Sequence, residues 1–190
     1  FRDEDARADR SPGEFYQLDM EMAFASQEDV FAVLEDVLPP IFAKFGTYDV
    51  ASAAPFRRIP YNTALETYGS DKPDLRIDLT CKNVSRLFEN SEFEPLRGQT
   101  VKMVDISDCT LTRKQVEKLL SDCEVQSGSK AYWFKVDENG QLAGGIAKFV
   151  APVEAELGKI IDLKPGTLVL ATAGQYLSLI HISEPTRLRC

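Results

Sequence analysis

Apolar and polar side chains alternate strictly from Tyr16 to Phe24, and this period of two constrains the fold more than any other feature of the sequence. Successive side chains of a strand point to opposite faces, so one face should join a core and the other should form a carboxylate-lined wall. The apolar positions are Tyr16, Leu18, Met20, Met22 and Phe24, and the polar ones are Gln17, Asp19 and Glu21. Since Pro12 and Gly13 break regular structure, residues 1–24 are expected to form a strand, a loop and a second strand.

A helix is predicted directly after this strand. Ser26 and Asp29 have the spacing of a capping box, and apolar residues follow at helical spacing, which indicates a helix over 27–45. Pro39 and Pro40 lack the amide donor and are expected to bend or interrupt it.

The pattern changes after Arg76, where short helical and extended segments follow one another. Asn139-Gly140 is a strong hairpin signal between two of the extended segments. We expect a loop at 47–59, a helix at 61–68, turns at 69–74 and 164–166, a helical turn at 83–90, strands at 100–106, 132–136, 141–144 and 167–172, and helices at 112–123 and 153–157. This is a second α+β unit, so the predicted fold class of the chain is α+β.

Composition excludes several classes of protein. The chain has 190 residues, 44% hydrophobic and 27% charged, which suits one or two compact domains and is unlike collagen, a coiled coil or a disordered segment. A net charge of -8 argues against a broad basic surface for nucleic acid, so any RNA contact must be local. No apolar run approaches the ~20 residues of a membrane helix. With Phe1 as its first residue and no apolar leader, the chain is expected to be soluble, cytoplasmic and cut from something longer.

Cysteine and histidine offer no obvious chemistry. The four cysteines have no C-x-x-C spacing and no histidine at ligand spacing, so reduced thiols of a cytoplasmic protein are expected. The single histidine, His181, lies in the segment 177–190, which resembles a translated sequencing adapter and is excluded from fold reasoning as a non-native tail. The alternative for this tail is an amphiphilic C-terminal strand.

Two features near the start could carry chemistry. Arg2 and Glu4 lie two residues apart, so on a strand they share a side, where a guanidinium and a carboxylate suit a phosphate bound with Mg²⁺. The alternative is a surface ion pair worth ~0–1 kcal/mol. Phe15 falls on the polar side of the following strand, where its ring could stack on a base or instead pack under a loop.

A family resemblance favours the chemical interpretation. F-R-D-E-D-A-R-A-D-R-S-P-G-E-F-Y-Q-L-D-M-E-M-A-F at 1–24 resembles motif 2 of class II aminoacyl-tRNA synthetases in its bacterial aspartyl form, and Y-G-S-D-K-P-D-L-R at 68–76 resembles the segment before the inserted domain of that family. One departure is Ser11-Pro-Gly-Glu14, where many members have Q-P-E, which leaves the role of Ser11 open.

The second unit resembles the GAD insertion of the same family. The likeness rests on Thr110–Gln115, Ala131–Val136, Gly145–Phe149 and the Pro165-Gly166 turn. The resemblance implies an antiparallel-sheet catalytic fragment at 1–76, a GAD-like insertion at 77–176 and the non-native tail at 177–190.

The resemblance also implies an activity, in which aspartate is joined to ATP as aspartyl-adenylate and then transferred to the 3′ end of tRNA(Asp), with tRNA(Asn) left open as a second acceptor. The implied cofactors are ATP and Mg²⁺, and the full-length protein is expected to be a homodimer. The implied residues are Arg2 and Glu4 in catalysis; Arg2, Asp3, Glu4, Ser11 and Phe15 at ATP; Glu4 at the metal; Arg2, Gln17, Asp19 and Glu21 at aspartate; and Arg7 and Arg10 at tRNA.

Two alternatives remain open from the sequence. One is a class II synthetase for asparagine or lysine, because motif 2 is shared, and the other is a non-catalytic module that binds nucleotide or RNA. Asp71, Lys72 and Asp74 could brace the rim of the active site or simply form a salt-bridged turn. Motif 1, motif 3 and an anticodon-binding domain are absent from this window, so the fragment alone is not expected to catalyse the reaction.

Overall fold

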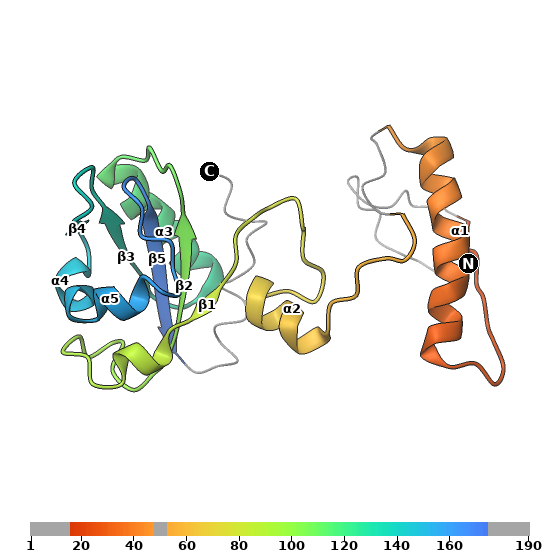
Figure 1. Cartoon of the computed structure of the whole chain (residues 1–190), viewed down its shortest axis with the longest axis horizontal. Coiled ribbons are helices and arrows are strands. Elements are labelled where there is room, and N and C mark those ends of the chain that lie inside the picture. Colours follow the sequence, from red (N-terminus) through yellow and green to blue (C-terminus); the bar gives the residue numbers. More distant parts are fainter. Residues whose placement is uncertain (1–15, 48–52, 175–190) are drawn as a thin grey trace. The chain divides into compact units, whose positions relative to one another are not determined.

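The computed structural model describes residues 16–47 and 53–174 and divides the chain into two compact units, Phe1–Arg58 and Ile59–Cys190 (Figure 1). The first of the two strands predicted within 1–24 and the predicted non-native tail at 177–190 lie outside the described residues. The boundary between units falls at 58/59, whereas the domain boundary expected from sequence is 76/77; the latter stays a prediction.

The first unit contains one long helix, α1, over Gln27–Phe45, as predicted. The capping box is confirmed, because the Asp29 carboxylate accepts from the Ser26 amide at 2.8 Å and from the Ser26 hydroxyl at 2.7 Å. The helix runs through Pro39 and Pro40 without interruption. Apolar side chains on α1 stay half-buried or exposed, and none is fully buried.

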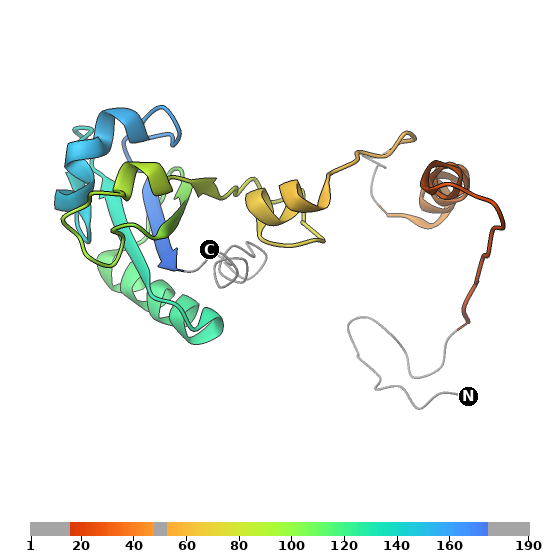
Figure 2. The ribbon, with the colours of Figure 1, turned by 90° about the horizontal axis from the view of Figure 1, so that it is seen from below.

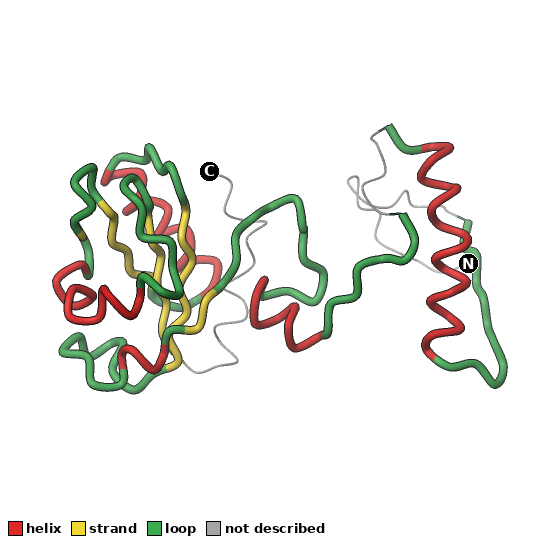
Figure 3. The backbone as a smooth tube through the Cα atoms, viewed as in Figure 1, coloured by secondary structure: helices red, strands yellow, loops and turns green. Residues whose placement is uncertain are grey.

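The strand predicted from the alternation at 16–24 is not formed. The described residues before α1 have no regular structure (Figure 3), and their apolar side chains are exposed, with Tyr16 and Phe24 fully so. A strand needs a neighbour for its backbone N–H and C=O groups and a core for its apolar face. Within the described part of the first unit there is neither a neighbouring strand nor a core, so the backbone of residues 16–24 has no strand to pair with there.

The second unit is built on a five-stranded antiparallel sheet in the order β1-β2-β5-β3-β4. Its strands are β1 Lys82–Asn83, β2 Thr100–Ile106, β3 Ala131–Val136, β4 Leu142–Ala143 and β5 Leu168–Gly174. The strands predicted in this unit are therefore confirmed within a few residues, and among its described strands only the two-residue β1 is not predicted from the sequence. The α+β class is confirmed.

Helices cover both faces of this sheet. Figure 2 shows α4 (Ala147–Val150) and α5 (Glu154–Leu157) on one side and α3 (Arg113–Ser127) on the other. The η2 turn (Ala151–Val153) joins α4 to α5, and the η1 turn (Ser85–Phe88) lies where a helical turn was predicted. The main core lies on the α4 and α5 side and includes Val84, Phe88, Leu96, Val101, Met103, Phe134, Ile146, Val150, Leu157, Ile161, Val169 and Ala171.

Helix ends in this unit follow their sequence signals. Thr112 and Gln115 form a capping box at the start of α3, and Gly128 ends α3 in the left-handed conformation. Helix α2 (Tyr61–Tyr68) begins after Pro60 and ends at Gly69, which is also left-handed, at φ 69°. In the described residues no helix is long and apolar enough to cross a bilayer.

Candidate functional site

Most of the predicted site falls on residues that the structure does not describe. These are Arg2, Asp3, Glu4, Arg7, Arg10, Ser11 and Phe15. The ATP-binding cluster and the tRNA-contacting loop therefore stay predictions.

Three of the four predicted aspartate-contacting residues are described, and they lie in the irregular segment before α1. Gln17, Asp19 and Glu21 are all exposed. The Gln17 amide Nε2 donates to the Asp19 carboxylate at 2.5 Å, so these two side chains meet. An exposed carboxylate with an amide beside it can accept hydrogen bonds from an ammonium group, which is the chemistry expected of this segment.

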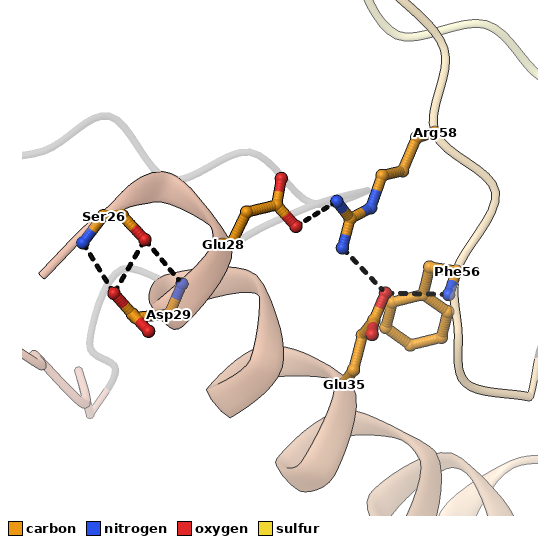
Figure 4. A network of polar contacts seen from close by, with 6 residues as sticks. All are labelled: Ser26, Glu28, Asp29, Glu35, Phe56 and Arg58. Carbon is orange, nitrogen blue, oxygen red and sulfur yellow. Dashed lines mark hydrogen bonds and ion pairs between the residues drawn. The ribbon is translucent and has the colours of Figure 1, made fainter.

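A polar network, not predicted from the sequence, ties the segment 53–58 to α1 (Figure 4). Arg58 forms an ion pair with Glu28 and lies 3.9 Å from the Glu35 carboxylate. That Glu35 carboxylate also accepts from the Phe56 backbone amide at 2.9 Å. Glu35 is only 17% exposed, so the hydrogen bond from the Phe56 amide lies in a partly desolvated place, where bonds to a charged group are stronger; the Arg58 side chain is 48% exposed.

An aromatic ring completes the surroundings of Arg58. The guanidinium carbon lies 4.9 Å from the centre of the Phe31 ring, a cation–π distance. The hydrogen bond that Arg58 donates to the Glu28 carboxylate raises the pKa of Arg58 above its usual value, so the group is permanently charged. The sequence signal for this network is present in hindsight, because Glu28 and Glu35 lie seven residues apart on one face of α1 with Phe31 between them. The matching arginine lies 23 residues after Glu35, and sequence spacing does not show that the two meet.

The turn at 70–76 closes with local ion pairs. Arg76 holds both carboxylate oxygens of Asp74, from Nε at 2.8 Å and from Nη2 at 2.5 Å, and its backbone amide donates to the same carboxylate at 3.1 Å. These contacts lower the pKa of Asp74 to about 2. Lys72 lies 2.8 Å from Asp71 and lowers the pKa of that carboxyl. The arrangement favours a salt-bridged turn over a rim that offers its charges to a ligand.

Metal-ligating groups do not gather in the described part of the chain. No three side chains of histidine, cysteine, aspartate or glutamate approach one another closely enough there to hold an ion. Glu4, the predicted Mg²⁺ ligand, lies outside the described residues. Among the described cysteines, Cys109 and Cys123 form no disulfide, and burial raises the pKa of the Cys123 thiol.

Comparison with known proteins agrees with the resemblance noted in the sequence. Residues 1–160 match the family described as tRNA synthetases class II (D, K and N). The aspartate--tRNA ligase of Streptomyces coelicolor is 45% identical over 189 residues, which is 98% of this chain and 32% of the relative. The aspartate--tRNA(Asp/Asn) ligase of Rickettsia akari is 43% identical over 196 residues, or 100% of this chain and 32% of the relative.

The chain thus spans about a third of the length of the curated relatives it matches. The matched length runs through both units, including the segments at 1–24 and 68–76 on which the resemblance rests. The expected similarity to a part of the bacterial aspartyl enzymes is confirmed.

Proposed function

Because the chain belongs to the class II tRNA synthetases of the D, K and N group, we propose that the full-length protein is an aspartate–tRNA ligase. The observation that carries the proposal is the identity of 45% to an aspartate--tRNA ligase along nearly the whole chain. The same match disfavours a free-standing nucleotide or RNA-binding module. Its proposed compartment is the cytoplasm, and its proposed assembly is a homodimer.

The proposed reaction has two balanced steps. A carboxylate oxygen of aspartate forms a bond to the α-phosphorus of ATP while the bond to the β-phosphate oxygen breaks, and pyrophosphate leaves. The hydroxyl at the 3′ end of tRNA then attacks the acyl carbon, the bond from that carbon to the AMP phosphate oxygen breaks, and AMP leaves while the hydroxyl proton passes to the departing phosphate or to solvent. Both steps concentrate negative charge at phosphate oxygens, so fixed positive groups contribute most to the rate.

The residues of the opening segment take the roles that this chemistry requires. Arg2 would contact the substrate carboxylate and the α-phosphate, offsetting the charge of the transition state. Asp3 would contribute to ATP binding on the same strand, with Ser11 nearby in the loop. Glu4 would hold Mg²⁺ or the adenine amino group, and Phe15 would stack on the adenine. The metal, when bound, would neutralise phosphate charge.

The polar segment that follows would hold the amino acid. Gln17, Asp19 and Glu21 offer an amide and two carboxylates toward the α-ammonium of aspartate or toward ordered water. The contact between Gln17 and Asp19 supports this proposal, since it fixes one carboxylate oxygen beside an amide. Arg7 and Arg10 would meet the acceptor end of tRNA, giving a local positive contact on an acidic protein.

The choice of tRNA is a second question. The relatives have two names, aspartate--tRNA ligase and aspartate--tRNA(Asp/Asn) ligase. We propose tRNA(Asp) as the acceptor, and charging of a tRNA(Asn) transcript decides whether tRNA(Asn) is also used.

The test of the activation step is ATP–pyrophosphate exchange by the full-length protein. Exchange should depend on aspartate and be absent with asparagine or lysine. Arg2→Ala removes a transition-state contact worth about 3–4 kcal/mol, so exchange should fall by roughly 10²–10³-fold. Arg113→Ala is the matched control, because Arg113 is an exposed arginine on α3 whose side chain is 81% accessible. Exchange that depends on asparagine or lysine instead, or that survives Arg2→Ala, contradicts the proposal.

A further inference from the structure

The turn between β3 and β4 contains the single Asn-Gly pair of the sequence (Figure 1). The strand register ends at Val136 and Leu142, and Asn139 and Gly140 lie between these two residues, both exposed. Gly140 has φ 79°, and a Cβ built there would meet nothing within 4 Å. The Asn139 side chain is therefore open to solvent, and no side chain at position 140 shields the peptide bond that joins the two residues.

These two residues can react with each other. The Gly140 backbone nitrogen can attack the side-chain carbonyl carbon of Asn139, because a glycine has no Cβ to hinder the approach. A nitrogen–carbon bond forms, the bond from that carbon to the side-chain nitrogen breaks, and ammonia leaves with the proton that the Gly140 amide gives up. Water then opens the resulting cyclic imide at one of its carbonyl groups. The product at position 139 is an aspartate or an isoaspartate, and the reaction requires no enzyme.

Asp137 holds the turn closed around the attacking nitrogen. The Gly140 amide donates to the Asp137 backbone oxygen at 3.0 Å, and the Asp137 amide donates to the Gln141 oxygen at 2.9 Å. The Asp137 carboxylate accepts from the amides of Asn139 and Gln141, each at 2.8 Å, and the first of these contacts is typical of an Asx turn. The Gly140 nitrogen must leave its acceptor before it can approach Asn139, so the reaction requires the turn to open.

We propose that Asn139 is a site of spontaneous deamidation and that the Asp137 carboxylate sets the rate of this modification in the folded protein. The exposed asparagine and the glycine after it provide the reacting groups. Hydrogen bonds to a charged acceptor are stronger than those to a neutral one, so the carboxylate contributes most to keeping the turn closed. Isoaspartate adds a carbon atom to the backbone of the turn, which moves Gln141 out of register with Asp137 and loosens β4 from β3.

The site is tested by incubating the full-length protein at mildly alkaline pH and mapping its peptides by mass spectrometry. The peptide that contains Asn139 should accumulate aspartate and isoaspartate at least about tenfold faster than the peptide that contains Asn90. Asn90 is the internal control, because it is also exposed but is followed by Ser91, whose Cβ hinders the attack.

Two variants test the role of Asp137. Asp137→Ala removes the carboxylate that accepts two amides of the turn, so Asn139 should convert at least about tenfold faster, and the Gly140 amide should exchange its hydrogen faster in parallel. The β2–β5 ladder should keep its protection. Glu138→Ala is the matched control, because it removes the same charge from the same exposed turn, whereas the Glu138 carboxylate accepts neither of these hydrogen bonds. Its rate of conversion should stay within about twofold of that of the unmodified protein.

Three outcomes overturn the proposal. Conversion of Asn139 that is no faster than conversion of Asn90 shows that the turn is not a modification site. Equal rates in Asp137→Ala and Glu138→Ala show that the Asp137 carboxylate does not set the rate. Faster conversion in Asp137→Ala together with lost protection of the β2–β5 ladder assigns the change to unfolding of the sheet instead of opening of the turn.

Discussion

Replacing Gly145 with alanine should destabilise the second unit more than the same change at any open glycine turn. Gly145 has φ 38°, and a Cβ built there would lie 1.8 Å from the Trp133 backbone oxygen and 2.8 Å from its carbonyl carbon. No side-chain rotation relieves a clash with backbone, so the backbone at residue 145 must move away from Trp133. This movement breaks the hydrogen bond from the Ile146 amide to the Trp133 oxygen, which is 2.9 Å long.

The magnitude follows from these terms. A left-handed conformation costs a non-glycine residue about 1–2 kcal/mol. Leaving the Trp133 oxygen without its donor adds about 1–3 kcal/mol. Ile146 is 5% exposed and packed in the core, so its displacement also costs packing energy. In total, we expect Gly145→Ala to lower the free energy of unfolding by at least about 3 kcal/mol.

Gly140→Ala is the matched control. Gly140 is also left-handed, at φ 79°, but a Cβ there meets nothing within 4 Å, so only the conformational cost of about 1–2 kcal/mol applies. The unfolding free energy of both variants is measured by urea unfolding of the 190-residue chain, followed by tryptophan fluorescence. Trp133 is the single tryptophan and lies on β3, so its fluorescence reports on the second unit. Equal losses of unfolding free energy in the two variants would show that the close approach of residue 145 to Trp133 has no effect on stability.

Three further predictions concern polar contacts. The Asp74 carboxyl should titrate near pH 2 by NMR, and any stability that it contributes should be present above about pH 4 and disappear as the pH falls toward 2; an unchanged pKa in Arg76→Gln would contradict the fork as its cause. Asp29→Ala should lower the helicity of α1 in far-UV circular dichroism, whereas Asp36→Ala in the middle of the same helix should have a smaller effect; equal effects would argue against the capping box. Glu35→Ala should speed hydrogen exchange at the Phe56 amide, which donates to that carboxylate, and should leave the Gly69 amide in the other unit unchanged; an unaffected Phe56 amide would exclude the contact.

Local signals in the sequence predicted the elements that local interactions build. Helix α1 begins and ends where the capping box and apolar spacing indicate, because those contacts join residues three or four apart. The prediction of a strand over 16–24 is wrong because a strand depends on a contact that is not local. A period of two indicates which side chains share a face, but it does not provide a partner strand.

The same distinction applies to the polar sites. The pairs within 70–76 are near neighbours in sequence, and a salt-bridged turn was among the alternatives considered. Contacts between Lys102 and Glu66, or between Arg58 and Glu35, join residues more than twenty positions apart, and nothing in either segment alone indicates its partner. Four-residue α4 was also missed, because so short a helix has no periodicity to read.

Charging of tRNA by the full-length protein decides whether the protein is an aspartate–tRNA ligase. With ATP, labelled aspartate and a tRNA(Asp) transcript, we expect labelled aspartate attached by an ester at the 3′ end and AMP released in equal amount. A full-length protein that transfers asparagine or lysine, or that binds ATP and tRNA but transfers no amino acid, would contradict it.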